Sequence, residues 1–178
     1  WAVVEGVRME VGFLVDRLTA LMMVVVTSVS LMVHVYTIGY MHDDPGYQRF
    51  FSYISLFTFA MLMLVMANNF LQLFFGWEAV GLVSYLLIGF WYRRPTAIFA
   101  NYKAFIVNRI GDFAFIVAIA IIVAYMGSLD YAEVFQRIPR AIGHDLFLTP
   151  GEPSKVITVI CVGLFIGAMG KSAQVPLH

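Results

Sequence analysis

The chain has 178 residues, of which 61% are hydrophobic and 12% are charged, and its formal net charge at pH 7 is zero. Soluble domains carry about 25% charged residues, so this composition excludes an ordinary water-facing surface. The zero net charge excludes a basic nucleic-acid footprint, and the single cysteine, Cys161, excludes an internal disulfide. The chain begins at Trp1 and stops at His178 without a polar tail, so we expect an internal fragment of a longer protein.

Five apolar segments approach the ~20 residues that an α-helix needs to cross a bilayer. Short polar turns separate them, and the turns at 42–46 and 93–96 each contain a proline that stops a helix. We therefore predict an all-α polytopic transmembrane helix bundle, which forms a single membrane-embedded region over residues 1–178. The predicted spans cover residues 13–41, 51–67, 70–91, 97–126 and 156–175.

The stretch from 127 to 155 holds seven charges and three prolines, so we expect it to lie outside the bilayer. Within it, residues 129–135 are predicted to form a short amphipathic helix at the membrane interface. The loops on one side of the predicted bundle carry three basic residues and those on the other side carry four. This balance does not orient the chain in the membrane.

Glu78 lies well inside the third predicted span, where a charged side chain costs ~2.5–3.5 kcal/mol on insertion scales. At about 100° per residue it shares one face with Gly81, Tyr85 and Gly89, and this small, polar face suits contact with other helices. Packing does not require such a charge, so we predict that Glu78 handles protons. The alternative is a protonated structural glutamate that makes one interhelical hydrogen bond.

Lys171 follows a helix whose Gly163, Gly167 and Gly170 share one face, where another backbone can approach closely. Pro176 lacks an amide hydrogen and clashes with the carbonyl four residues earlier, so the last helix should kink or break just beyond Lys171. Irregular backbone at membrane depth is tolerated when it is buried in protein or lines a wet cavity. We therefore predict a second proton site at Lys171. The alternative is a lysine that extends to the lipid headgroups.

Other polar residues of the predicted spans suggest a supporting path. Arg109 and Asp112 are three residues apart, close enough to pair on one helix. Asn108 falls on the same stripe as Asp112, as a lining for water would; a structural ion pair near the membrane surface is the alternative. His34 lies deep in the first span, where it relays protons or serves as a hydrogen-bonded structural residue. No motif predicts a metal or cofactor site in this chain.

Four motifs resemble, in order, the largest antiporter-like subunit of respiratory complex I, which is called subunit L in bacteria and chain 5 in mitochondria. The first is the glutamate-bearing stretch that begins Gly76-Trp77-Glu78-Ala79-Val80-Gly81 and runs to Phe90. The others are Lys103-Ala104-Phe105, Asn108-Arg109-Ile110-Gly111-Asp112 and Gly170-Lys171-Ser172-Ala173-Gln174-Val175-Pro176-Leu177-His178. The resemblance runs from about Asp16 to the end of the chain and is weakest over residues 130–154.

The resemblance implies a proton-translocating subunit of NADH-quinone oxidoreductase, of which this chain holds roughly the third to seventh helices. Glu78 matches the family's key glutamate, Lys171 its first key lysine on a discontinuous helix, and Asp112 with Arg109 a supporting pair. Proton movement would be driven by quinone reduction in other membrane and peripheral subunits, which would hold the flavin, the iron–sulfur clusters and the quinone. The resemblance implies an energy-transducing membrane, either the bacterial inner membrane or the mitochondrial inner membrane.

Two alternative interpretations of the function remain. Mrp-type sodium/proton antiporter subunits share the glutamate and lysine motifs, although the sequence Trp77-Glu78-Ala79-Val80-Gly81 favours complex I. The second alternative is that the segment is a scaffold whose buried charges only fix helix packing. Substitution of those charges would then reduce assembly and leave pumping per assembled complex unchanged.

Overall fold

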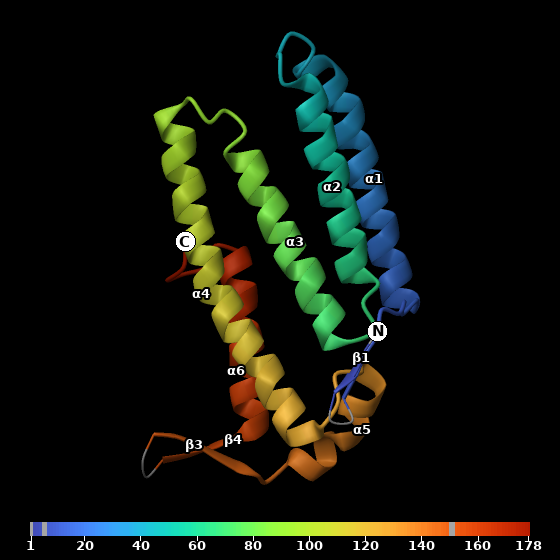
Figure 1. Ribbon diagram of the computed structural model, residues 1–178, viewed down its shortest axis with the longest axis vertical. Coiled ribbons are helices and arrows are strands. Elements are labelled where there is room, and N and C mark those ends of the chain that lie inside the picture. Colours follow the sequence, from blue (N-terminus) through green and yellow to red (C-terminus); the bar gives the residue numbers. More distant parts are fainter. Residues whose placement is uncertain (1, 5–6, 150–151) are drawn as a thin grey trace. The chain divides into compact units, whose positions relative to one another are not determined.

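The computed structural model describes residues 2–4, 7–149 and 152–178 (Figure 1). The chain forms two compact units. One, called here the α1 unit, contains Gly12–Ala67 and Gln72–Phe105; the other, the α6 unit, contains Trp1–Val11, Asn68–Leu71 and Ile106–His178.

An antiparallel helix pair forms the frame of the α1 unit. Helix α1 (Arg17–Tyr40) begins after Asp16, whose carboxylate accepts a 2.7 Å hydrogen bond from the Thr19 amide and so caps the helix. Helix α2 (Tyr47–Val65) returns beside α1 (Figure 1). Gly76 of α3 (Phe70–Ile88) lets that helix approach α2 closely, because a Cβ at this position would lie 2.8 Å from the backbone nitrogen of Leu64.

Four of the described helices are long and apolar enough to cross a membrane, namely α1, α2, α3 (Phe70–Ile88) and α4 (Pro95–Met126). Helix α6 (Val156–Lys171) is apolar but has 16 residues, fewer than the ~20 of a complete span. The predicted all-α membrane bundle is confirmed. The expected break is also confirmed, since α6 ends at Lys171 and the chain turns before Pro176.

Several helices begin or end two to four residues from the limits of the predicted spans, because hydropathy locates an apolar stretch but not a helix cap. Helix α1 starts at Arg17, four residues after the start of the first predicted span. Helix α4 starts at Pro95, two residues before the start of the fourth, and proline is favoured in the first helical turn. The remaining shifts are at Tyr47 for the start of α2, Val65 for its end, Ile88 for the end of α3 and Lys171 for the end of α6.

The α6 unit contains the polar stretch between α4 and α6. Helix α5 (Tyr131–Ala141) is capped by Asp130, whose carboxylate accepts hydrogen bonds from the Ala132 amide at 2.8 Å and the Glu133 amide at 3.3 Å. Val134 is buried, and the Arg137 guanidinium donates to the carbonyl of Met126 at 2.5 Å, which ties α5 to the end of α4. The short amphipathic helix expected at 129–135 is therefore present, although it begins after its cap and continues to Ala141.

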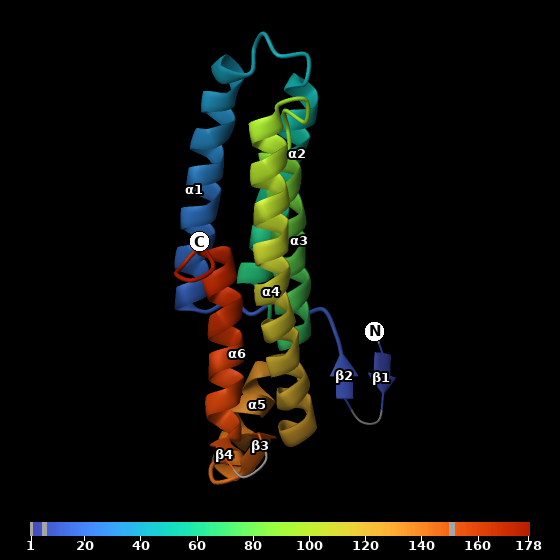
Figure 2. The same cartoon turned by 90° about the vertical axis from the view of Figure 1, so that its left-hand side faces the viewer.

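Two short antiparallel hairpins were not predicted. Strands β1 (Ala2–Val4) and β2 (Val7–Met9) pair near the start of the chain, and β3 (Asp145–Thr149) pairs with β4 (Glu152–Lys155) before α6 (Figure 2). Asp145 and Lys155 face each other in the β3–β4 register, and their side chains form a 2.6 Å ion pair. Strands this short have no clear alternating pattern, so the sequence gives no signal for them.

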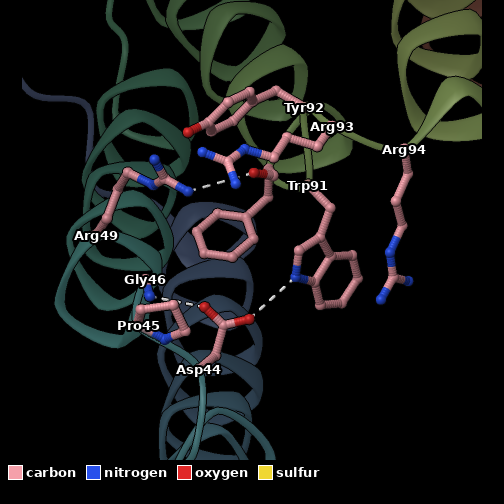
Figure 3. A pocket seen from close by; sticks show the side chains of 9 residues that line it. Asp44, Pro45, Gly46, Arg49, Trp91, Tyr92, Arg93 and Arg94 are labelled. Atoms are coloured by element: carbon pink, nitrogen blue, oxygen red, sulfur yellow. Dashed lines mark hydrogen bonds between the residues drawn. The ribbon is translucent and has the colours of Figure 1, made fainter.

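The turn between α1 and α2 is fixed by Asp44. One carboxylate oxygen accepts a 2.7 Å hydrogen bond from the Gly46 amide, and the other accepts a 3.1 Å bond from the Trp91 indole (Figure 3). The indole hydrogen bond, followed by the Gly46 amide bond, lowers the pKa of Asp44 below its ordinary value of 3.8. A carboxyl whose pKa is lowered by folding stabilises the fold above its unfolded pKa, and this contribution is lost as the pH falls through the folded pKa.

We expect the emission of Trp91 to report this linkage in a protein whose other tryptophans, including Trp1 and Trp77, are replaced by phenylalanine. The emission should be constant at neutral pH and change only below the ordinary Asp44 pKa of 3.8. Asp44→Asn should shift the emission at every pH. Asp43→Asn is the matched control, because the Asp43 side chain is 99% exposed and pairs with His42 instead. A neutral-pH spectrum of Asp44→Asn that equals that of the parent would contradict the assignment.

Candidate functional site

The glycine face of α6 has the close backbone neighbour that was predicted, and this neighbour is α4. The contact positions Lys171. A Cβ at Gly167 would lie 2.6 Å from the Phe115 ring, and one at Gly163 would lie 2.9 Å from the Ala118 Cβ. Gly170 faces Gly111 of α4, where an added Cβ would lie 3.3 Å from the Gly111 Cα. Because no side chain separates the helices here, the last residue of α6 is brought close to the polar face of α4.

Asp112 is the centre of a buried charge cluster, which we call the Asp112 cluster. Its side chain is 5% exposed, and one carboxylate oxygen lies 3.7 Å from the Lys171 ammonium nitrogen. The other oxygen lies 3.7 Å from a guanidinium nitrogen of Arg109, which confirms the predicted pairing within α4. Lys171 is 18% exposed and Arg109 is 40% exposed, so the carboxylate is buried and the arginine is partly exposed.

The geometry of the Asp112 cluster makes its charges interdependent. Both distances are ion-pair distances, longer than the ~2.7–2.9 Å of a tight charge-assisted hydrogen bond. At ~4 Å, two unit charges interact by ~4 kcal/mol when the effective dielectric constant is ~20. A proton that binds the carboxylate or leaves the ammonium therefore changes the energy of the other partner substantially.

Glu78 lies half-buried near the middle of α3. Its predicted helix-contacting face is confirmed in the α1 unit, because Tyr85 packs edge-on against Phe105 of α4 with ring centroids 5.5 Å apart. Further along this face, a Cβ at Gly89 would lie 2.4 Å from the Asn101 amide nitrogen. Glu78 and Lys171 belong to different compact units, so their pairing stays a prediction.

His34 joins a chain of hydroxyl groups between α1 and α2. Its Nδ1 lies 2.7 Å from the Ser30 carbonyl, and its Nε2 lies 3.2 Å from the Ser55 hydroxyl. The Ser30 hydroxyl lies 3.2 Å from the same Nδ1 and 2.7 Å from the Thr58 hydroxyl. Both readings of His34 fit this arrangement, since a hydrogen-bonded structural histidine and a relay need the same partners.

Asn108 lies half-buried on α4, one turn before Asp112, as the predicted polar stripe requires. Its role as a lining for water stays a prediction. Sequence reasoning missed the contact between Lys171 and Asp112, because spacing within one helix could supply only the Arg109 partner. The available signal was the glycine face of α6, which predicted a close backbone neighbour without saying which helix provides it. Among the described residues, no group of three or more histidine, cysteine, aspartate or glutamate side chains is arranged to hold a metal ion.

Asp112→Ala should destabilise the protein by about 3 kcal/mol, because removing one partner of a buried ion pair leaves the other charge poorly compensated. We take the low end of the known range because the two distances are long. The measurement is thermal or denaturant unfolding of the purified full-length protein. Asp43→Ala, at an exposed aspartate, serves as the control and should change stability little. Equal stabilities for the two variants would show that the Asp112 cluster does not stabilise the fold.

These features define a polytopic α-helical membrane protein that carries ionisable residues within its helices. The profile for the transmembrane region of the NADH:quinone oxidoreductase/Mrp antiporter family matches residues 67–178. A second profile, for the N-terminus of chain 5 of NADH-ubiquinone oxidoreductase (complex I), matches residues 1–51. The chain belongs to the NADH:quinone oxidoreductase/Mrp antiporter family.

Curated relatives match the whole chain. It is 64% identical over 180 residues to the NADH-quinone oxidoreductase subunit L of Neisseria meningitidis serogroup A, and 51% identical over 178 residues to that of Rickettsia bellii. It is 47% identical over 178 residues to the chloroplastic NAD(P)H-quinone oxidoreductase subunit 5 of Zygnema circumcarinatum. The chain spans 27%, 28% and 25% of the lengths of these three relatives, respectively.

Proposed function

We propose that the chain is part of a proton-translocating membrane subunit of NADH-quinone oxidoreductase, in which Glu78 and Lys171 carry the proton. The observation that carries this proposal is the Asp112 cluster, in which the Lys171 ammonium lies 3.7 Å from a carboxylate that is 5% exposed. An ionisable residue at membrane depth is costly and points to an ion or proton pathway. The names of the relatives support the same function.

In the proposed mechanism, Glu78 and Lys171 each alter the proton affinity of the other, and this effect varies as their separation changes during turnover. A nearby carboxylate stabilises the charged ammonium, and loss of that carboxylate makes release of the proton easier. Asp112 offers Lys171 a second carboxylate, so that the ammonium is stabilised at one position by Asp112 and at another by Glu78. Arg109 pairs with Asp112 on the same helix, while Asn108 and His34 support the hydrated path.

The energy of such an ion pair is comparable with the work of moving a proton against a membrane potential. Moving one charge against 100 mV takes ~2.3 kcal/mol, and a close ion pair of the kind seen at Asp112 is worth ~4 kcal/mol before desolvation is subtracted. Forming or breaking one such pair is therefore enough to move a proton against a membrane potential. The work would come from quinone reduction in partner subunits, which would hold the flavin, the iron–sulfur clusters and the quinone.

Purification of the full-length protein with its native partners tests the assignment. Co-purification with subunits that carry flavin and iron–sulfur centres, together with NADH-driven proton uptake in vesicles, supports the proposal. An assembly of membrane subunits alone that exchanges sodium for protons without NADH would instead support the Mrp-type alternative. The match of residues 1–51 to the complex I chain 5 N-terminus favours the first outcome.

A further inference from the structure

A pocket of about 420 Å³ lies in the α1 unit where α1 and α3 end and α2 and α4 begin. Its lining includes Arg49, Arg93 and Arg94, with Asp44 as the one acidic residue (Figure 3). Its volume falls within the ~300–1,000 Å³ of typical ligand pockets. None of the residues predicted to move protons lines it, so the proposed function does not explain this concentration of positive charge.

Aromatic rings lie against the three arginines of the pocket. The Arg49 guanidinium lies 4.6 Å from the Phe90 ring centroid, and Arg94 lies 4.6 Å from that of Trp91. Arg93 lies 5.9 Å from the Tyr92 ring centroid. Stacking on a ring orients a guanidinium while leaving its N–H groups available to an anion.

Asp44 does not neutralise the pocket. Its two oxygens accept hydrogen bonds from the Gly46 amide and the Trp91 indole, which hold the turn (Figure 3). Arg49 donates to the Phe90 carbonyl at 3.3 Å, which uses one of its five N–H groups. Three guanidiniums against one carboxylate leave an excess of two positive charges among the lining residues.

The position of the pocket indicates the source of its anion. It lies at the ends of four apolar helices, where lipid headgroups meet water, and Trp91 and Tyr92 are the residue types that are enriched at that level. Basic pockets at helix ends of membrane proteins are suited to anionic lipid headgroups. Phosphate groups fit the planar, forked donors of arginine especially well.

We propose that the pocket formed by Arg49, Arg93 and Arg94 binds the phosphate of an anionic phospholipid. The arginines supply the charge, and the rings of Phe90, Trp91 and Tyr92 fix the arginines. Such a lipid would link the α1–α2 turn to the α3–α4 turn.

Native mass spectrometry of the full-length protein in its membrane assembly tests this proposal, with phosphatidylglycerol, phosphatidylcholine and inorganic phosphate as probes. Phosphatidylglycerol should bind in preference to phosphatidylcholine, and inorganic phosphate should not displace it. Arg94→Gln should weaken binding about fivefold, the equivalent of about 1 kcal/mol per arginine near an anionic surface. Replacement of all three arginines by glutamine should weaken it more than tenfold.

Two further variants keep the test decisive. Arg17→Gln is the matched control, because Arg17 is an exposed arginine at the opposite end of α1 and should leave lipid binding unchanged. Arg94→Lys keeps the charge and should retain most of the binding even if the triple variant fails to fold. Equal phosphatidylglycerol binding by Arg94→Gln, Arg94→Lys and Arg17→Gln would overturn the proposal. Equal binding of both lipids, or full displacement by inorganic phosphate, would overturn the assignment to an anionic lipid.

Discussion

Lys171→Ala should slow proton transfer through this subunit by ~100-fold or more, because it removes a positioned proton-transfer group. Lys171 lies at the end of α6, 18% exposed and 3.7 Å from the Asp112 carboxylate. Arg109, the other cation of the Asp112 cluster, cannot replace it because a guanidinium does not release its proton in proteins. The measurement is NADH-driven acidification of vesicles that contain the assembled complex, normalised to the amount of complex. Glu78→Gln should give a loss of similar size, since it keeps the shape of the side chain and removes its titratable proton.

Lys155→Ala is the control for Lys171→Ala. Lys155 is an exposed lysine that pairs with Asp145 outside the predicted membrane path, and its loss should leave the flux unchanged. If Lys171→Ala lowers the amount of assembled complex but leaves the flux per complex at the parent value, the scaffold alternative holds.

Gly167→Leu should make the protein about 1–3 kcal/mol less stable than Gly39→Leu, the cost of an overpacked helix contact. A Cβ at Gly167 would lie 2.6 Å from the Phe115 ring, whereas a Cβ at Gly39 would have no neighbour within 4 Å. Both positions lie inside helices, so the gain in helix propensity from replacing glycine cancels in the comparison. Denaturant unfolding of the full-length protein measures the difference.

Gly167→Leu should also disturb the Asp112 cluster. If α6 moves away from α4, the ion pair between Lys171 and Asp112 lengthens, so Gly167→Leu should also lower proton flux. Equal stability and equal flux for the two leucine variants would mean that the α4–α6 contact does not position Lys171.

The sequence was informative where one physical effect dominated. Hydropathy located the four long helices, and the missing amide of Pro176 explained why α6 stops at Lys171. The i, i+3 spacing of Arg109 and Asp112 predicted a pair that the structure contains. In each case the cause lies within a few residues of its effect.

Features that depend on distant residues could not be predicted in the same way. Asp112 meets Lys171 because the glycines of α6 happen to face α4, and the sequence does not state which helix they face. Arg49 joins Arg94 in one pocket because two turns that are far apart in the chain lie together in the α1 unit. The β3–β4 hairpin depends on pairing between strands too short to show a pattern.

A double-mutant cycle tests most directly whether Glu78 and Lys171 work as one unit. Proton flux per NADH oxidised is measured in vesicles for the parent, Glu78→Gln, Lys171→Ala and the double variant. Residues that act together are strongly non-additive, so the double variant should lose no more flux than either single variant. Parent-level flux in either single variant, or losses that multiply in the double variant, would contradict a shared proton path through these two residues.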